Sequence, residues 1–405
     1  MSAQGARQVH SSADVRTPDY QGTSAHHDKP VPRGKRDEGL SSSPKKKPRI
    51  ALFDNMKGIA IFLVVLGHFT GKAGMIVDSH FLTTVLTFIY LFHMPLFLFC
   101  SGIFAGKAWY KRHQAPSDKV LLYLILYGVF LLLIVLLDIL VFQKMPGVNP
   151  FVITSAPWFM LVLALFMLMV PIMGSVRPVS FILVSIALAV GSGLFLEEAG
   201  TLSLSRFFVY LPYFAMGFYL GPDNITKFVD AIQSRVGEQM RIILAAVTLA
   251  LIFLVLFLCF SDDQLTAIKR LSTGMNLLTV LSVHWDISIP FLVVLRLVLY
   301  PSVFAMGMVV TLLCPKDKCF LTFMGQRSFQ VYIFHILILY CFKNYHVYGG
   351  FISTEPWITL SPFIIAAVLT PLLAWPKGPN DLVKKCSDWT KKVTKPRSHP
   401  MEKVA

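Results

Sequence analysis

The sequence predicts an all-α membrane protein, a polytopic bundle of about ten transmembrane helices with both termini in the cytoplasm. Three observations lead to this prediction. Of the 405 residues, 55% are hydrophobic and only 15% are charged, and the mean hydropathy is +0.63. Apolar runs of helix length recur along the chain, and basic residues gather between alternate pairs of these runs. A water-facing surface could not cover so much apolar material.

Ten apolar runs have roughly the 17 to 25 residues that cross a bilayer as a helix. Residues 175–177 alone join the fourth run to the fifth, which predicts a tight helical hairpin there. The expected spans are 53–74, 81–106, 119–142, 157–174, 178–196, 204–221, 240–260, 289–313, 326–344 and 357–375.

The basic residues predict the orientation of the chain. Lysines and arginines precede the first span and follow the second, sixth, eighth and tenth spans, and these positions share one side of a ten-span protein. That is the positive-inside pattern, although Lys269 and Arg270 in the long loop after the seventh span depart from it. The formal net charge of +15 is therefore explained by the lipid bilayer, and no nucleic-acid partner is expected.

The same patterns predict three parts in the chain. Residues 1–50 are rich in Ser, His, Pro and Lys and are expected to form a disordered, basic cytoplasmic tail. Residues 51–376 are expected to form the transmembrane domain. Residues 377–405 are expected to form a second basic cytoplasmic tail. The protein is accordingly expected to be an integral, multi-pass membrane protein.

Asp54, Lys57 and His68 are ionisable side chains within the first span. At 100° per residue, the eleven-residue step from Lys57 to His68 returns to almost the same helical face about 16 Å further along. Asp54 lies within about 40° of His68 around the helix axis. Because charge inside a membrane usually marks a functional site, this face is the first candidate. Burial would keep His68 neutral, so it could act as a general base, and Asp54 suits Lys57 better as a partner.

The second span places His93 and Pro95 near the middle of the bilayer, with Ser101 and Gly102 two turns further on. Proline removes a backbone hydrogen bond, so neighbouring groups must compensate at this depth. His93 and Ser101 are candidate donors to a reacting oxyanion. The alternatives are that His93 hydrogen-bonds across a helix interface and that Ser101 and Gly102 merely let helices pack closely.

Later spans contain further polar side chains. Arg327 at the start of the ninth span is either a clamp for phosphate or carboxylate or an anchor to lipid headgroups, and His335 follows eight residues later. Arg206 and Arg296 are costly in a membrane unless they are paired or line water. Asp138, near the outer end of the third span, is the expected anionic partner for such an arginine.

Several of these blocks resemble the membrane acyltransferase 3 family, and especially its fucose 4-O-acetylase-like branch. The resemblance covers about residues 51–375 and is most specific in the first block. The matching blocks are Asp54-x-x-Lys57-Gly58 through Val65-Leu-Gly-His68, Phe92-His93-Met-Pro95-Leu-Phe97 with Ser101-Gly102, Pro157-Trp158-Phe159, Arg206-Phe-Phe-Val-Tyr-Leu-Pro212 with Gly217 and Gly221, and Gly325-Gln-Arg327-Ser328 with Tyr332 and His335.

The resemblance implies an O-acyltransferase that moves an acyl group, usually acetyl, from cytoplasmic acyl-coenzyme A to a hydroxyl of a sugar or glycan. Lys57 and His68 match the family's basic-residue-x10-His motif. Many members have arginine at the Lys57 position, and lysine lacks the planar fork of arginine. The block at Trp158 also lacks the Ser and Glu of a Trp-Ser-Leu-x-x-Glu motif found in longer-chain members.

We therefore expect acetyl-coenzyme A or another acyl-coenzyme A as co-substrate, a sugar or glycan acceptor, and neither a metal nor a bound cofactor. The expected site residues fall into three groups: for catalysis His68, Lys57, Asp54 and His93; for acyl-coenzyme A Lys57, Arg112, Lys119 and Arg327; and for the acceptor or the oxyanion Ser101, Trp158, Arg206 and His335.

Two other classes of protein compete with this interpretation. One is a proton-coupled or ion transporter in which the acid, the lysine and the histidines form a relay. Pro95 and Pro301 would suit broken helices of such a transporter, but no matching pair of interrupted segments indicates a repeat. The other is a haem-binding electron carrier. No helix carries paired histidines at haem spacing, which disfavours it.

Overall fold

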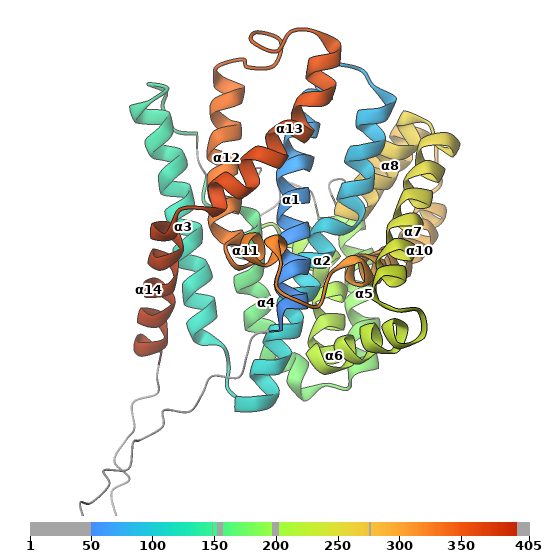
Figure 1. The fold of residues 1–405 in the computed structure, drawn as a ribbon, viewed down its shortest axis with the longest axis vertical. Helices are drawn as coiled ribbons and strands as arrows, with labels where there is room; N and C mark the ends of the chain where they lie inside the picture. Colours follow the sequence, from blue (N-terminus) through green and yellow to red (C-terminus); the bar gives the residue numbers. More distant parts are fainter. Residues whose placement is uncertain (1–49, 148, 152–156, 197–201, 275–276, 395–405) are drawn as a thin grey trace, which may run out of the picture. The chain divides into compact units, whose positions relative to one another are not determined.

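The computed structural model describes residues 50–147, 149–151, 157–196, 202–274 and 277–394 (Figure 1). Within these ranges the chain forms fourteen helices and no strand, which confirms the all-α class. Apart from residue 50, the N-terminal tail that we expected to be disordered lies outside the described residues, and so do residues 395–405 of the second tail.

The first half of the chain contains the longest helices. They are Ala51–Ala73 (α1), His80–Arg112 (α2), Ser117–Leu140 (α3), Trp158–Ser175 (α4), Pro178–Phe195 (α5), Leu204–Val236 (α6) and Glu238–Cys259 (α7). The second half mixes long and short helices. These are Asp262–Thr273 (α8), Leu278–Trp285 (α9), Ile289–Leu313 (α10), Phe320–Gln326 (α11), Ser328–Asn344 (α12), Glu355–Ala374 (α13) and Lys377–Val393 (α14).

Eight of the described helices are long and apolar enough to cross a membrane. They are α1 to α5, α7, α10 and α13, and each coincides with a predicted span. The two remaining predicted spans also form helices, α6 and α12, but α12 has only 17 residues and α6 continues into a polar segment. The integral, multi-pass nature of the protein is thus confirmed. A count of ten would require α6 and α12 to cross the bilayer as well.

A break inside α6 explains where the sixth predicted span ends. Gly221 has φ 65° and ψ 173°, which is not a helical conformation. Glycine adopts positive φ at little cost because it has no Cβ. The following residue, Pro222, has no N–H to donate back into the preceding turn. The apolar segment therefore stops at Gly221, where the sequence placed its end, and a second helical segment follows.

Four helices lie outside the predicted spans. The long loop after α7 contains α8 and α9, and α8 begins with a capping box at Ser261. The Ser261 hydroxyl accepts a hydrogen bond from the Gln264 N–H at 3.4 Å, and the Gln264 side chain accepts one from the Ser261 N–H at 3.0 Å. The short α11 precedes α12. Much of the predicted C-terminal tail, Lys377–Val393, is the helix α14.

Helix α1 packs against α2, α11, α12 and α13 (Figure 1). Glycines allow its closest contact, because a Cβ at Gly58 would overlap the Leu321 carbonyl and a Cβ at Gly325 would overlap the Asp54 carbonyl. The backbones of α1 and α11 therefore touch beside the acidic start of α1. By contrast, many apolar side chains on α3 and α7 are exposed, as expected of helices that face lipid.

The predicted packing role of the Ser-Gly pair in α2 is confirmed for Gly102. A Cβ at Gly102 would overlap the Phe214 carbonyl of α6, and a Cβ at Gly217 of α6 would overlap the Phe99 carbonyl of α2. Small residues at helix interfaces let two backbones approach closely in membranes. The contact fixes α2, which carries His93 and Ser101, against α6, which carries Arg206.

Asn55 ties the start of α1 to the segment between α10 and α11. Its side-chain amide donates to the carbonyls of Pro315 at 2.8 Å and Asp317 at 2.9 Å, and its oxygen accepts from the Thr322 hydroxyl. Asn55 is fully buried. An alanine there would leave two carbonyls and a hydroxyl without this partner.

We therefore expect Asn55→Ala to destabilise the protein by about 3 kcal/mol, the sum of the lost hydrogen bonds and the unsatisfied groups. The measurement is the melting temperature of the purified protein in detergent. Asn224→Ala is the matched control, because the Asn224 side chain is exposed and donates only to the Leu220 carbonyl of its own helix. Equal melting temperatures for the two variants would contradict the bracing role of Asn55.

Candidate active site

Two histidines from distant parts of the chain face each other beside the bundle interior. His68 of α1 and His335 of α12 have ring centroids 5.3 Å apart, with their planes tilted by 50°. His68 is partly accessible, whereas His335 is fully buried. The helices that carry them, α1 and α12, pack against each other.

The hydrogen bonding of His335 fixes the chemistry of its ring. Nδ1 lies 2.9 Å from the Val331 carbonyl, an acceptor, so Nδ1 carries the proton and donates it. Nε2 of a neutral ring is then a lone-pair acceptor. It is buried and has no hydrogen-bond partner among the described residues. The sequence suggested His335 as an oxyanion donor, but the neutral ring offers an acceptor on its free side.

His93 is also buried, on α2. Its Nδ1 lies 2.7 Å from the Ile89 carbonyl, one helical turn back, and its ring lies 4.9 Å from that of Tyr90. Gly67, which precedes His68, packs against the side chains of Ile89 and Tyr90. The two histidine-bearing turns of α1 and α2 are therefore close neighbours.

A continuous row of ring contacts leads from Arg206 to this pair. The Arg206 guanidinium lies over the Trp158 ring at 5.0 Å, and Trp158 contacts Phe159 at 5.9 Å. Phe159 contacts Tyr332 at 5.3 Å, and Tyr332 contacts His335 at 5.8 Å. Four of the predicted acceptor or catalytic positions are thus connected through two aromatic side chains that the sequence analysis did not assign.

A pocket of about 210 Å³ opens between the five helices α1, α2, α3, α4 and α12. We call it the inner pocket, because it lies toward the start of α1, which is predicted to be cytoplasmic. Its wall is mostly aromatic and aliphatic, and its two cationic side chains belong to α1 and α3. It is lined by Lys57, Ile61, Phe97, Ser101, Phe104, Ala105, Ala108, Pro116, Lys119, Tyr123, Phe159, Leu163, Met167, Ser328, Phe329 and Tyr332.

Lys57 has the carboxylate partner that the sequence suggested. Its ammonium lies 2.7 Å from the Asp54 carboxylate, which is almost fully buried. Asp54 also accepts a hydrogen bond from the Gln326 amide at 3.2 Å. The Lys57 ammonium lies 5.3 Å from the centre of the Phe104 ring, so its charge is held at the wall of the inner pocket.

The other predicted acyl-coenzyme A ligands divide into two groups. Lys119 lines the inner pocket and donates to the Ser387 hydroxyl of α14 at 3.3 Å. Arg112 is exposed at the end of α2 and does not line the pocket. Arg327 stacks on Phe323 at 4.3 Å and donates to the Ala374 carbonyl at 3.1 Å, so it braces α13 rather than facing the pocket.

Ser101 lines the inner pocket, but its hydroxyl donates to the Phe97 carbonyl at 2.9 Å. To donate to a reacting oxyanion, the Ser101 hydroxyl would have to give up its hydrogen bond to the Phe97 carbonyl. Asp138, the anionic partner to test for a membrane arginine, accepts a hydrogen bond from the Tyr340 hydroxyl. Arg296 lies instead against Gly193 of α5.

A second pocket, of about 340 Å³, lies at the other end of α1 and α12. We call it the outer pocket. It is lined by Lys72, Met75, Ile76, Lys144, Phe342, Lys343, Asn344, His346 and Tyr348. Along α1 the order is Lys57, His68, Lys72, and along α12 it is Tyr332, His335, Phe342. The paired imidazoles therefore lie between the two pockets on both helices.

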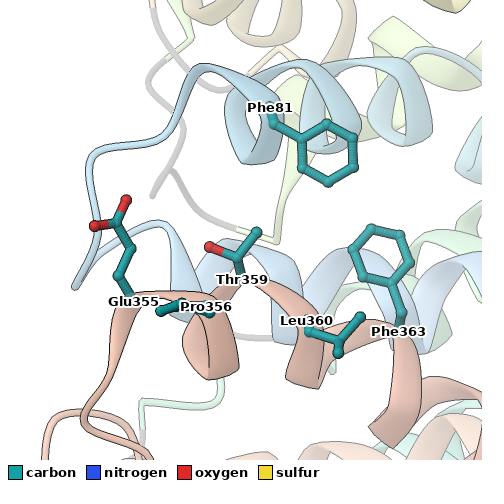
Figure 2. Close-up of a pocket in the computed structure, with 6 residues that line it drawn as sticks. All are labelled: Phe81, Glu355, Pro356, Thr359, Leu360 and Phe363. Carbon is teal, nitrogen blue, oxygen red and sulfur yellow. The ribbon is translucent and has the colours of Figure 1, made fainter.

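A third hollow, of about 480 Å³, lies between the starts of α2 and α13 and is lined by Phe81, Glu355, Pro356, Thr359, Leu360 and Phe363 (Figure 2). The rings of Phe81 and Phe363 face each other across it at 6.0 Å. It offers neither an imidazole nor a cation, so it lacks the groups that an acyl transfer would need.

The fold and these pockets define a multi-pass membrane protein with two facing imidazoles between an inner and an outer pocket. The acyltransferase domain model of the acyltransferase 3 family matches residues 50–376, most of the chain. The protein belongs to this family and is a membrane acyltransferase. The match does not favour the transporter alternative. Comparison with curated proteins and with solved structures gave no significant match.

Proposed function

We propose that the protein is an O-acetyltransferase that uses cytoplasmic acetyl-coenzyme A and a sugar or glycan hydroxyl, as in the fucose 4-O-acetylase-like branch. The observation that carries the proposal is the position of His68 and His335 between the inner and outer pockets. A donor entering from one side and an acceptor entering from the other would meet at these two rings.

The inner pocket suits the coenzyme A arm. Its apolar wall would cover the pantetheine chain, while Lys57 and Lys119 would offer positive charge to the phosphates. Tyr332 forms part of this wall and contacts His335. The thioester would therefore lie beside Tyr332, within reach of the histidine pair.

In the proposed reaction, His68 removes the proton of the acceptor hydroxyl as its oxygen attacks the thioester carbonyl carbon. The new C–O bond forms, the C–S bond breaks, and the proton passes from His68 to the departing thiolate of coenzyme A. A positioned imidazole contributes about 10²- to 10⁴-fold to such a step. Ser101 and Arg206 are the candidate donors to the tetrahedral oxyanion. The His93 ring, which sequence reasoning also suggested, donates from Nδ1 to the Ile89 carbonyl, so its Nε2, like that of His335, is an acceptor.

His335 is proposed as a positioning residue for His68. Rotation of either ring would bring a His68 N–H toward the His335 Nε2, which has no partner among the described residues, within hydrogen-bond reach of about 3 Å. That bond would hold one tautomer of His68 and stabilise its imidazolium as the proton arrives. The second nitrogen of His68 would then face the hydroxyl.

For Lys57 we expect Lys57→Ala to raise the KM for acetyl-coenzyme A about tenfold, through loss of a charge-assisted contact with phosphate. Lys57→Arg keeps the charge beside Asp54 and should be milder. Initial rates against acetyl-coenzyme A concentration measure both effects. Lys316→Ala is the control, since Lys316 pairs with Asp230 outside both pockets. An equal loss in both Lys57 variants would mean that lysine geometry itself is required.

The test of the proposed function is an assay of purified protein in lipid nanodiscs with acetyl-coenzyme A labelled in the acetyl group and a panel of glycans. Transfer of the label to a glycan, with release of free coenzyme A, is the expected result. Ion uptake without thioester cleavage would overturn the proposal in favour of transport.

A further inference from the structure

The outer pocket is the second of the two pockets on the α1 and α12 pair, and its charge is unusual. Lys72 of α1, Lys144 after α3 and Lys343 of α12 all line it, together with His346. No Asp or Glu is among its lining residues. Burial raises the pKa of the Tyr348 phenol, so this wall residue stays neutral.

The three lysines are not neutralised by the protein. None of them has a carboxylate within ion-pair distance among the described residues. Lys144 donates to the Asn344 side-chain oxygen at 2.5 Å, which carries no charge. The Asp138 carboxylate, which accepts a hydrogen bond from the Tyr340 hydroxyl, does not line this pocket. The pocket therefore presents uncompensated positive charge.

Membrane topology does not explain these lysines. The positive-inside rule accounts for basic residues on the cytoplasmic side, and the outer pocket lies at the opposite ends of α1 and α12. Like charges that share one pocket also repel each other, so the arrangement stabilises neither the fold nor the orientation. A bound anion would remove that repulsion.

The position of Lys72 connects the charge to the reaction. Lys72 follows His68 by four residues, one turn and about 6 Å along α1, and it lies on the same side of the helix. A ligand of the size of one sugar ring could place a hydroxyl at His68 and an anionic group at Lys72.

We infer that the outer pocket is the anion subsite of the acceptor, and that the natural acceptor is a hydroxyl compound that carries a carboxylate or a phosphate, such as a uronic acid or a phosphorylated sugar. The inference rests on the proposed function and names the class of its acceptor. The anionic group would lie between Lys72 and Lys343, with Lys144 at the mouth.

The first test compares matched acceptors with the full-length protein in phosphatidylcholine nanodiscs and saturating acetyl-coenzyme A. Methyl β-glucuronide and methyl β-glucoside 6-phosphate carry an anionic group, and methyl β-glucoside does not. Mass spectrometry of the O-acetylated sugar gives kcat and KM. We expect kcat/KM to be at least about tenfold higher for an anionic sugar than for the neutral glucoside, because one charge-assisted contact contributes about that much.

Matched variants distinguish an effect of the lysines in the outer pocket from an effect of the protein's overall positive charge. Lys72→Gln with Lys343→Gln should reduce the preference to about twofold, mainly through a higher KM for the anionic sugar. Lys316→Gln with Lys384→Gln removes the same charge outside both pockets and should keep the preference. Equal use of the neutral sugar, or an unchanged preference in the Lys72 and Lys343 variant, would overturn the inference.

A second readout does not depend on acyl transfer. Reductive methylation followed by mass spectrometry reports how fast each lysine reacts. An anionic sugar should slow the methylation of Lys72 and Lys343, and the neutral sugar should not. No slowing by either anionic sugar would overturn the inference. So would slowing by phosphatidylglycerol alone with no further effect of the sugars, because the anion would then be a lipid headgroup.

The two readouts also distinguish failure of the inference from failure of the proposed function. Protection of the lysines by an anionic sugar without any acetyl transfer would overturn the proposed function and support the subsite. Acetyl transfer to neutral and anionic sugars alike, without protection, would support the proposed function and overturn the subsite.

Discussion

His68→Ala is expected to lower kcat for acetyl transfer by about 10²- to 10⁴-fold, the usual contribution of a general base. Expression and insertion should remain close to those of the unchanged protein, because His68 is partly accessible and its side chain makes no hydrogen bond to the described residues. The measurement is single-turnover transfer from labelled acetyl-coenzyme A in nanodiscs, normalised to folded protein by size-exclusion chromatography.

The control for this prediction is His284→Ala. His284 is exposed on α9 and lines neither pocket, so its loss removes an imidazole without touching the candidate site. Wild-type transfer by folded His68→Ala protein would remove His68 from the mechanism. A variant that no longer folds would instead show a void-volume peak, and His68→Gln would then serve as the milder replacement.

His335→Leu is expected to lower kcat by about 10- to 100-fold, because it removes an acceptor worth about 1.5–3 kcal/mol when its partner becomes charged. The KM for acetyl-coenzyme A should change little, since His335 does not line the inner pocket. His335→Gln offers a side-chain oxygen in place of Nε2 and should recover part of the loss. Steady-state kinetics of the three proteins give both constants.

Partial recovery by glutamine is what separates a positioning role from a packing role. Leucine fills the space of the imidazole with apolar atoms and should fold at least as well. If leucine and glutamine were equally inactive in folded protein, the acceptor function of Nε2 would be refuted. If both were fully active, His335 would have no part in the reaction.

Much of the fold could be predicted because hydrophobicity along the chain is a local property. The eight long apolar helices coincide with predicted spans, and the break at Gly221 lies where the sequence ended the sixth span. The helices α8 and α9 were not predicted because they have only 12 and 8 residues, which is too short for a membrane span. The helix α14 is amphipathic, but its many lysines led the sequence analysis to class this segment as a basic tail.

The candidate site was harder to predict, because it depends on contacts between distant segments. The face of Asp54, Lys57 and His68 follows from helical geometry alone. The pairing of His68 with His335 does not, since it requires α1 and α12 to pack in parallel. Helix periodicity likewise could not show that Arg327 turns toward α13.

Two sets of residues carried no local signal. Asn55 lies within the most distinctive motif, yet its three partners belong to a segment more than 250 positions away. Lys72 and Lys343 were not assigned to a site, because basic residues were considered only as markers of the cytoplasmic side. These two lysines lie at the outer ends of their spans. A count of basic residues on the outer side would have found them.

The buried Nε2 of His335, for which no described residue is a hydrogen-bond partner, has a consequence for efforts to stabilise the protein. A buried polar atom without a hydrogen bond costs about 1–3 kcal/mol, so an imidazole at this position stabilises the fold less than an apolar side chain of similar size would. Heat-selection for robust variants would tend to replace this histidine with an aliphatic residue. The most thermostable variants would then have low catalytic activity. Selection of stable variants for crystallisation should therefore include an activity assay.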